Sequence, residues 1–112
     1  MRFLSFSTEN HALAPVEVEV SLVPGVPKFH FLGLPDSVIR ESELRIKSAL
    51  RHCDYDIPSG KQILVNLKPI YRRKTSEGLD LAIALAFLYK TGQWRPRDMG
   101  SSGEVYVYGQ LN

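Results

Sequence analysis

Hydrophobic and polar residues alternate most regularly in the first quarter of the chain. Val16, Val18 and Val20 are separated by Glu17 and Glu19. An alternation with period two is typical of a β-strand that has one buried and one solvated face. We therefore expect a strand here, with its valines facing the core and its glutamates facing water.

Two further apolar runs lie on either side of this strand. Residues 2–8 (RFLSFST) alternate more weakly and predict a first strand, and residues 29–32 (FHFL) predict a more buried one. Residues 24–27 (PGVP) have the composition of a turn. Because only this turn separates the second and third strands, we expect the two to form a hairpin.

A helical pattern follows the third strand. Pro35 lacks an N–H group and Asp36 can accept hydrogen bonds from free backbone amides, so both suit a helix start. Apolar residues continue at helical spacing as far as Cys53, and the helix should end near 52–54. We expect Cys53 to lie on the apolar face, where it would pack rather than react.

The opposite side of this helix carries charges of both signs. Glu41 precedes Arg45 by four residues, which is the favourable order for an ion pair on one helix face. Glu43 and Lys47 have the same relationship. We interpret these charges as the solvated back of the helix rather than as a binding site.

Two strands and a second helix complete the pattern. Residues 62–67 (QILVNL) predict a central strand and residues 105–109 (VYVYG) a last one. Residues 79–89 are apolar on every side except at Asp80, which predicts a buried helix. Since a carboxylate in such surroundings needs a partner, we expect Asp80 to cap the helix or to pair with a cation such as Lys74.

The element order is therefore β-β-β-α-β-α-β. This order predicts a single α+β domain over residues 1–112, with a mixed β-sheet and two main helices on one face. The chain has 112 residues, 44% of them hydrophobic and 23% charged, which is ordinary for a soluble domain with one core.

Composition also sets the expected compartment. The single cysteine excludes an internal disulfide, the N-terminus lacks a signal-peptide pattern, and no window approaches the ~18 apolar residues of a membrane span. We expect a cytoplasmic protein with no membrane partner.

One cluster of residues is a candidate contact site. Lys68, Tyr71, Arg72, Arg73 and Lys74 form a basic run without an intervening acidic residue. Cations on one face can contact phosphates, and an exposed tyrosine can stack on a base. The net charge of only +2 gives little long-range attraction. A solvated loop is therefore the simpler interpretation for this domain alone, and contact with DNA or a neighbouring subunit is the alternative.

Several segments together indicate a family. Residues 31–36 (FLGLPD), 41–42 (ES), 45–50 (RIKSAL) and 80–85 (DLAIAL) occur in this order, and the set resembles the N-terminal domain of magnesium-chelatase-like AAA+ proteins of the ComM/YifB type. The resemblance covers nearly the whole chain. It implies a fold like the second domain of small-subunit ribosomal protein five and like Lon-type peptidase domains. That fold contains a left-handed β-α-β crossover, against the usual right-handed rule.

The resemblance also implies a role. The chain would be a non-catalytic N-terminal accessory domain, not itself an enzyme, and would be cut short before an AAA+ ATPase domain of the same polypeptide. The parent would be an ATPase in DNA processing linked to competence and recombination. No G-x-x-x-x-G-K-[ST] motif is present. We therefore expect ATP and Mg only in the missing ATPase domain, with DNA as a possible partner and a homo-hexamer only at full length.

Two alternatives remain. A degenerate Lon-like peptidase domain would need a serine, activated by a lysine, in a glycine-flanked turn at the start of the second helix. Residues 77–80 (EGLD) lack that serine, and Ser76 comes before the predicted helix. A stand-alone nucleic-acid-binding module would need the basic run to form one continuous exposed patch. The three histidines are scattered, so we predict no catalytic, cofactor-binding or metal-binding residue.

Overall fold

The predicted order of strands and helices is confirmed by a computed structural model. It describes residues 1–9, 12–32, 36–68, 79–96, 103–109 and 111. The elements are β1 (Arg2–Glu9), β2 (Ala12–Pro24), β3 (Phe29–Leu32), α1 (Asp36–His52), β4 (Lys61–Lys68), α2 (Asp80–Lys90) and β5 (Glu104–Tyr106).

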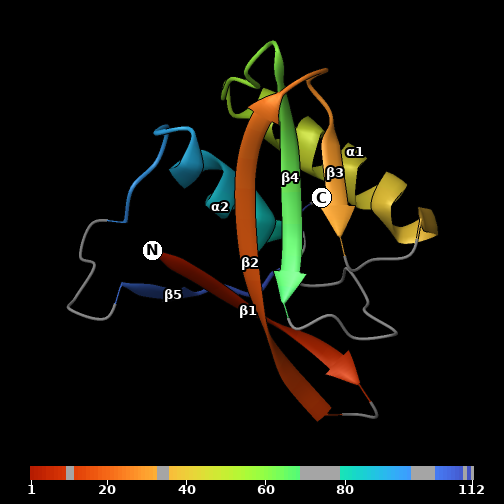
Figure 1. Cartoon of the computed structure of the whole chain (residues 1–112). Helices are drawn as coiled ribbons and strands as arrows, with labels where there is room; N and C mark the ends of the chain where they lie inside the picture. Colours follow the sequence, from red (N-terminus) through yellow and green to blue (C-terminus); the bar gives the residue numbers. More distant parts are fainter. Residues whose placement is uncertain (10–11, 33–35, 69–78, 97–102, 110, 112) are drawn as a thin grey trace.

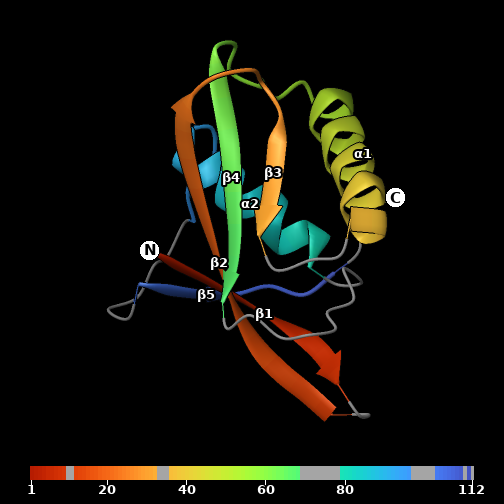
Figure 2. The ribbon, with the colours of Figure 1, turned by 45° about the vertical axis from the view of Figure 1, so that its right-hand side comes forward.

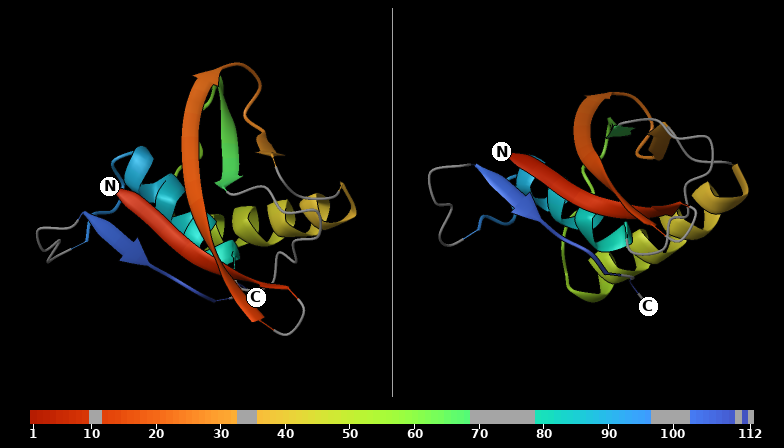
Figure 3. Two further views of the ribbon diagram at one scale, coloured as in Figure 1. Left: turned by 60° about the horizontal axis from the view of Figure 1, so that its bottom comes forward. Right: turned by 90° about the horizontal axis from the view of Figure 1, so that it is seen from below.

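The strands form one mixed five-stranded sheet in the order β3-β4-β2-β1-β5. β3 is parallel to β4 and β1 is parallel to β5, whereas the other neighbours are antiparallel. Figure 3 shows β5 running beside β1 in the same direction. Both helices lie on the same face of the sheet, behind the strands in Figure 1 and still on one side of them in Figure 2. The predicted α+β fold class and helix placement are therefore confirmed. We call the uncovered side the open face.

The predicted hairpin between β2 and β3 is wrong. β4 lies between these strands and pairs with both of them. The physical reason is burial: Ile63, Val65 and Leu67 of β4 are fully buried, so β4 is most stable with a strand on each side, as the predicted central strand. β2 instead forms its hairpin with β1, in register from Phe3 opposite Val18 to Glu9 opposite Ala12.

The connection from β3 through α1 to β4 has an unusual hand. In Figure 1 both strands run downward, α1 lies behind them, and β4 lies to the left of β3. A path that descends in front, returns behind and advances to the left is left-handed, whereas almost all such connections are right-handed. This is the handedness that the family resemblance implied.

The core fills the space between the helices and the sheet. β2 contributes the inward valines of the sequence pattern, and α2 is buried round most of its circumference, as predicted for an almost wholly apolar helix. The fully buried large residues include Phe29, Ile46, Ile63, Leu67, Leu79, Ile83 and Phe87. Burying each such side chain stabilises the fold by about 1.5–3 kcal/mol.

Backbone hydrogen bonds fix both ends of α2. At its end, Gln93 N–H donates to Leu88 O (2.8 Å) and Gly92 N–H donates to Tyr89 O (3.1 Å), which is a Schellman motif with Gly92 in the left-handed region (φ 75°). At its start, Leu81 N–H donates to Gly109 O (3.1 Å). The chain after β5 thus satisfies one of the free amides of the helix.

The end of α1 corrects another expectation. The helix stops at His52, and the next residue, Cys53, is exposed rather than packed. Asp54 adopts a left-handed conformation (φ 61°), and Tyr55 N–H bonds back to Leu50 O (2.9 Å). Because the chain turns away here, the helical face predicted from the spacing does not extend to Cys53.

Candidate functional site

Lys68 is the one candidate contact residue within the described part of the chain. It ends β4, is exposed on the open face, and its Nζ lies 3.1 Å from Oε2 of Glu19. The other candidates, Tyr71, Arg72, Arg73 and Lys74, lie outside the described residues. Whether the five form one patch therefore stays a prediction.

A second cation, which the sequence analysis missed, lies near Lys68. Arg2 and Lys68 both line a hollow of about 270 Å³ on the open face. The guanidinium of Arg2 forms salt bridges with the carboxylates of Glu104 (2.6 Å) and Glu17 (3.3 Å). The pKa of the Arg2 guanidinium is raised, first by its hydrogen bond to Glu17 and then by the charges of Glu17 and Glu104. Both cations have carboxylate partners.

Aromatic rings lie beside these charges. Phe6 stacks with Tyr106, with ring centroids 6.4 Å apart, and lies 6.5 Å from the ring of Tyr108. Tyr106 is 62% exposed and Tyr108 is 53% exposed. We call these three residues the aromatic patch. The sequence signal for it was only the alternation around Tyr106, because the parallel pairing of β1 with β5 brings distant parts of the chain together.

A buried ion pair joins the two helices. Arg45 Nε donates to Oδ2 of Asp80 at 2.6 Å, and Asp80 is fully buried. The pKa of Arg45 is raised, mainly by this hydrogen bond, although burial lowers it in part. The prediction that Asp80 pairs with a cation is confirmed. The partner found is Arg45, whereas the suggested Lys74 lies outside the described residues.

The charged side of α1 is only partly the solvated surface that we predicted. The expected pairs are present: Arg45 with Glu41 at 3.2 Å and Lys47 with Glu43 at 3.4 Å. However, the side chains of Arg45 and Glu43 are only 18% and 17% exposed. Glu43 Oε2 accepts the N–H of Phe29 at 2.9 Å, so this side of α1 also holds the edge strand β3.

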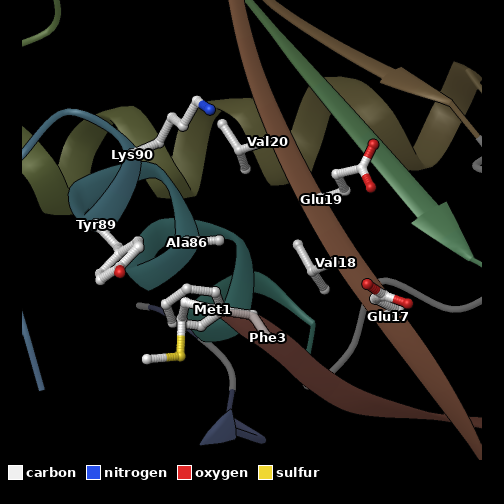
Figure 4. Close-up of a pocket in the computed structure, with 9 residues that line it drawn as sticks. All are labelled: Met1, Phe3, Glu17, Val18, Glu19, Val20, Ala86, Tyr89 and Lys90. Atoms are coloured by element: carbon white, nitrogen blue, oxygen red, sulfur yellow. The ribbon is translucent and has the colours of Figure 1, made fainter. Parts of the chain in front are cut away.

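A cavity of about 250 Å³ lies between β2 and the C-terminal half of α2. Figure 4 shows Val18 and Val20 pointing toward it from β2, Ala86 facing them from α2, and Lys90 at its rim. Glu17 and Glu19 point away from it. Val18, Val20 and Ala86 therefore give the cavity one apolar wall, and Lys90 places a positive charge at its rim.

The described residues contain no group of three or more side chains that could hold a metal ion. None of the helices in that part of the chain is long and apolar enough to cross a membrane.

Comparison with known protein families gives a match over most of the chain. Residues 18–112 match the family described as subunit ChlI of Mg-chelatase. The match begins within β2 and includes both helices, β3, β4 and β5.

Individual relatives agree with this match. Competence protein ComM of Haemophilus influenzae is 37% identical over 78 residues, covering 70% of this chain and 15% of the relative. Proteins called YifB, from Escherichia coli and Salmonella typhimurium, are 35% and 34% identical over 79 and 100 residues. These alignments cover 70% and 87% of this chain but only 15% and 20% of the YifB proteins. The chain thus spans a fifth or less of the length of these relatives.

Proposed function

Since the chain belongs to the Mg-chelatase ChlI family and is similar to ComM and YifB, we propose that it is a non-catalytic accessory domain of an AAA+ ATPase acting in ATP-driven DNA processing. The observation that carries this proposal is the small share of each relative's length that this chain covers. Most of this chain matches a fifth or less of each relative, which leaves ample length there for an ATPase domain.

The chemistry at the start of α2 supports the non-catalytic part of the proposal. A Lon-like peptidase would place its serine in this region, and here Asp80 is buried and bonded to Arg45. Ser42 is also buried, and its Oγ has no hydrogen-bond partner among the described residues. A serine nucleophile needs an adjacent base and access to substrate, so neither residue suits hydrolysis.

The remaining parts of the proposal concern partners. ATP and Mg would be bound by the ATPase domain of the same polypeptide, which would also drive assembly into a hexamer in the cytoplasm. DNA would contact Lys68, Tyr71, Arg72, Arg73 and Lys74. Because the aromatic patch lies on the same sheet face as Lys68, its exposed tyrosines would offer further surfaces on which bases could stack.

DNA contact is tested by binding of labelled single-stranded and forked DNA across a salt series. The test variant changes Arg72, Arg73 and Lys74 together to Ala. A control variant changes three cations elsewhere, Lys28, Arg40 and Arg51, to Ala, so that both variants lose the same charge. We expect salt-sensitive binding that is lost in the test variant and retained in the control. No binding at low salt, or equal loss in both variants, contradicts DNA contact through this loop.

The peptidase alternative is tested separately with fluorogenic peptides. We expect no hydrolysis above the rate in buffer. Turnover that is abolished by Ser42→Ala would contradict the non-catalytic assignment.

A further inference from the structure

β2 is longer than the strand that pairs with it in the hairpin. The ladder with β1 ends where Phe3 lies opposite Val18, whereas β2 continues to Pro24 and pairs with β4 along that whole stretch. From Glu19 onward, therefore, one side of β2 has no strand partner within the described ranges. Figure 1 shows this upper half of β2 rising beside β4, away from β1.

The register identifies which backbone groups face this free side. Gly25 N–H donates to Gly60 O at 3.0 Å, in line with the register in which Pro24 lies opposite Lys61. In an antiparallel ladder such hydrogen-bonded pairs recur at every second residue. Ser21 and Val23 therefore direct their N–H and C=O groups toward β4.

The backbone groups of the alternate residues must then face the opposite edge of β2. Val20 and Leu22 direct their N–H and C=O groups to the free side of β2, continuing the line in which Val18 pairs with Phe3. Alternating donors and acceptors along an unpaired strand are what an added strand requires. We call the backbone of Val20 and Leu22 the free edge.

The cavity described above lies against this edge. Val20 belongs to its lining, and Val18, Ala86 and Tyr89 extend the same apolar wall. A strand added here would place every second side chain on the helix side of the sheet. Small apolar side chains at those positions could enter the cavity. The free edge would then prefer peptides with such residues at alternate positions.

The charges around the cavity favour one kind of partner. Lys90 is exposed at the rim, and the guanidinium of Arg95 lies 5.8 Å from the ring centroid of Tyr89. Neither cation has a carboxylate partner in the part of the chain that is described. Glu17 and Glu19 point away and are paired on the open face. Among the described residues, the positive charges of Lys90 and Arg95 are therefore available to an acidic ligand.

We propose that the free edge of β2 docks an extended acidic peptide segment of another protein by strand addition. The backbone groups of Val20 and Leu22 supply the hydrogen bonds, and the apolar wall of the cavity takes every second side chain of the added strand. Lys90 and Arg95 attract the negative charge of the segment as a whole. Nucleic acid does not match a row of alternating backbone donors and acceptors. The cavity lies on the helix side of the sheet and Lys68 is on the open face, so the proposal does not depend on the proposed DNA contact.

Amide hydrogen exchange of the 112-residue chain tests the pairing directly. The probe is a labelled seven-residue peptide that alternates Val and Glu, with its termini blocked. We expect exchange at Leu22 to slow by at least about tenfold on saturation, since a free amide becomes hydrogen-bonded. Ser21 and Val23, already bonded to β4, should change little. Binding without protection at Val20 or Leu22 overturns strand addition.

Fluorescence anisotropy with matched probes and variants tests the chemistry. We expect a Val-Lys peptide, and a Val-Glu peptide N-methylated at alternate residues, each to bind at least about tenfold more weakly. Changing Lys90 and Arg95 to Glu should cause a similar loss, whereas changing Arg40 and Arg51 on α1 to Glu should not. The proposal is overturned if the Val-Glu peptide does not bind, or if the Val-Glu and Val-Lys peptides bind equally. It is also overturned if single-stranded DNA displaces the peptide and itself protects the amides of Val20 and Leu22.

Discussion

Arg45 in α1 and Asp80 in α2 form the hydrogen-bonded ion pair that joins the two helices, with Nε and Oδ2 2.6 Å apart. Asp80 is in the first turn of α2, where a carboxylate also faces the positive end of the helix dipole. The pair therefore stabilises both the start of α2 and its packing against α1.

Removal of Arg45 should destabilise the domain strongly. The Arg45→Ala variant leaves a buried carboxylate without its cation, and breaking such a pair costs about 3 kcal/mol. We expect a decrease of this size in the free energy of unfolding, measured by urea titration monitored by circular dichroism.

The matched control for this prediction is Glu41→Ala. Glu41 is the exposed partner of the same arginine, with its side chain 75% exposed, so its loss should cost less than about 1 kcal/mol. Replacing Arg45 with Met and Asp80 with Leu together should recover part of the stability, because no buried charge remains. If Arg45→Ala and Glu41→Ala lower the free energy of unfolding equally, the buried ion pair stabilises the fold no more than the exposed one.

Glu43 should protect the edge strand β3. Its carboxylate accepts the N–H of Phe29 at 2.9 Å, so Glu43→Ala should cost about 1.5 kcal/mol and accelerate amide exchange at Phe29. Lys47→Ala, which removes only the ion pair of Glu43, should leave the exchange at Phe29 slow. If both variants accelerate it equally, the ion pair rather than the hydrogen bond fixes β3.

Cys53 should react in the folded protein. It is exposed, so a thiol reagent such as Ellman's reagent should modify it stoichiometrically without denaturant, at a rate within about tenfold of that in the unfolded chain. Modification should leave the unfolding midpoint nearly unchanged, since the thiol does not pack in the core. If Cys53 reacts only after unfolding, its side chain is buried, as the sequence pattern predicted, and the exposed position is wrong.

Gly92 should be required for its backbone conformation alone. Its φ is 75°, and a Cβ built there meets no atom within 4 Å. We expect Gly92→Ala to lower the free energy of unfolding by about 1 kcal/mol, and Gly92→Asn by less, because asparagine tolerates this region better. Thermal unfolding measures both, and equal costs would contradict a purely conformational origin.

Local patterns predicted the elements well but not their pairing. The alternation around Val18 and the apolar stretch after Asp80 each reflect interactions within one element. The place of β4 between β2 and β3 depends instead on which strand gains most from two neighbours, a property of the whole sheet. The exposure of Cys53 likewise depends on the turn at Asp54, which periodicity does not encode.

The candidate site was predictable to a smaller extent. Lys68 could be proposed from the sequence because it belongs to a continuous basic run. Arg2 and Tyr106 could not, since only the parallel pairing of β1 with β5 places them on the same sheet face. Asp80 could be singled out because it is the one charged residue in the apolar stretch 79–89. Its partner could not, because Arg45 lies 35 residues away on another helix.

The hydrogen bond from Leu81 to Gly109 has a mechanical consequence. In any polypeptide that continues beyond residue 112, tension on the following chain reaches the first turn of α2 before it reaches the sheet. That turn also contains Asp80, so a displacement of Leu81 would strain the ion pair between Asp80 and Arg45 and, through it, shift α1. The start of α2 would thus transmit force from the following chain to both helices.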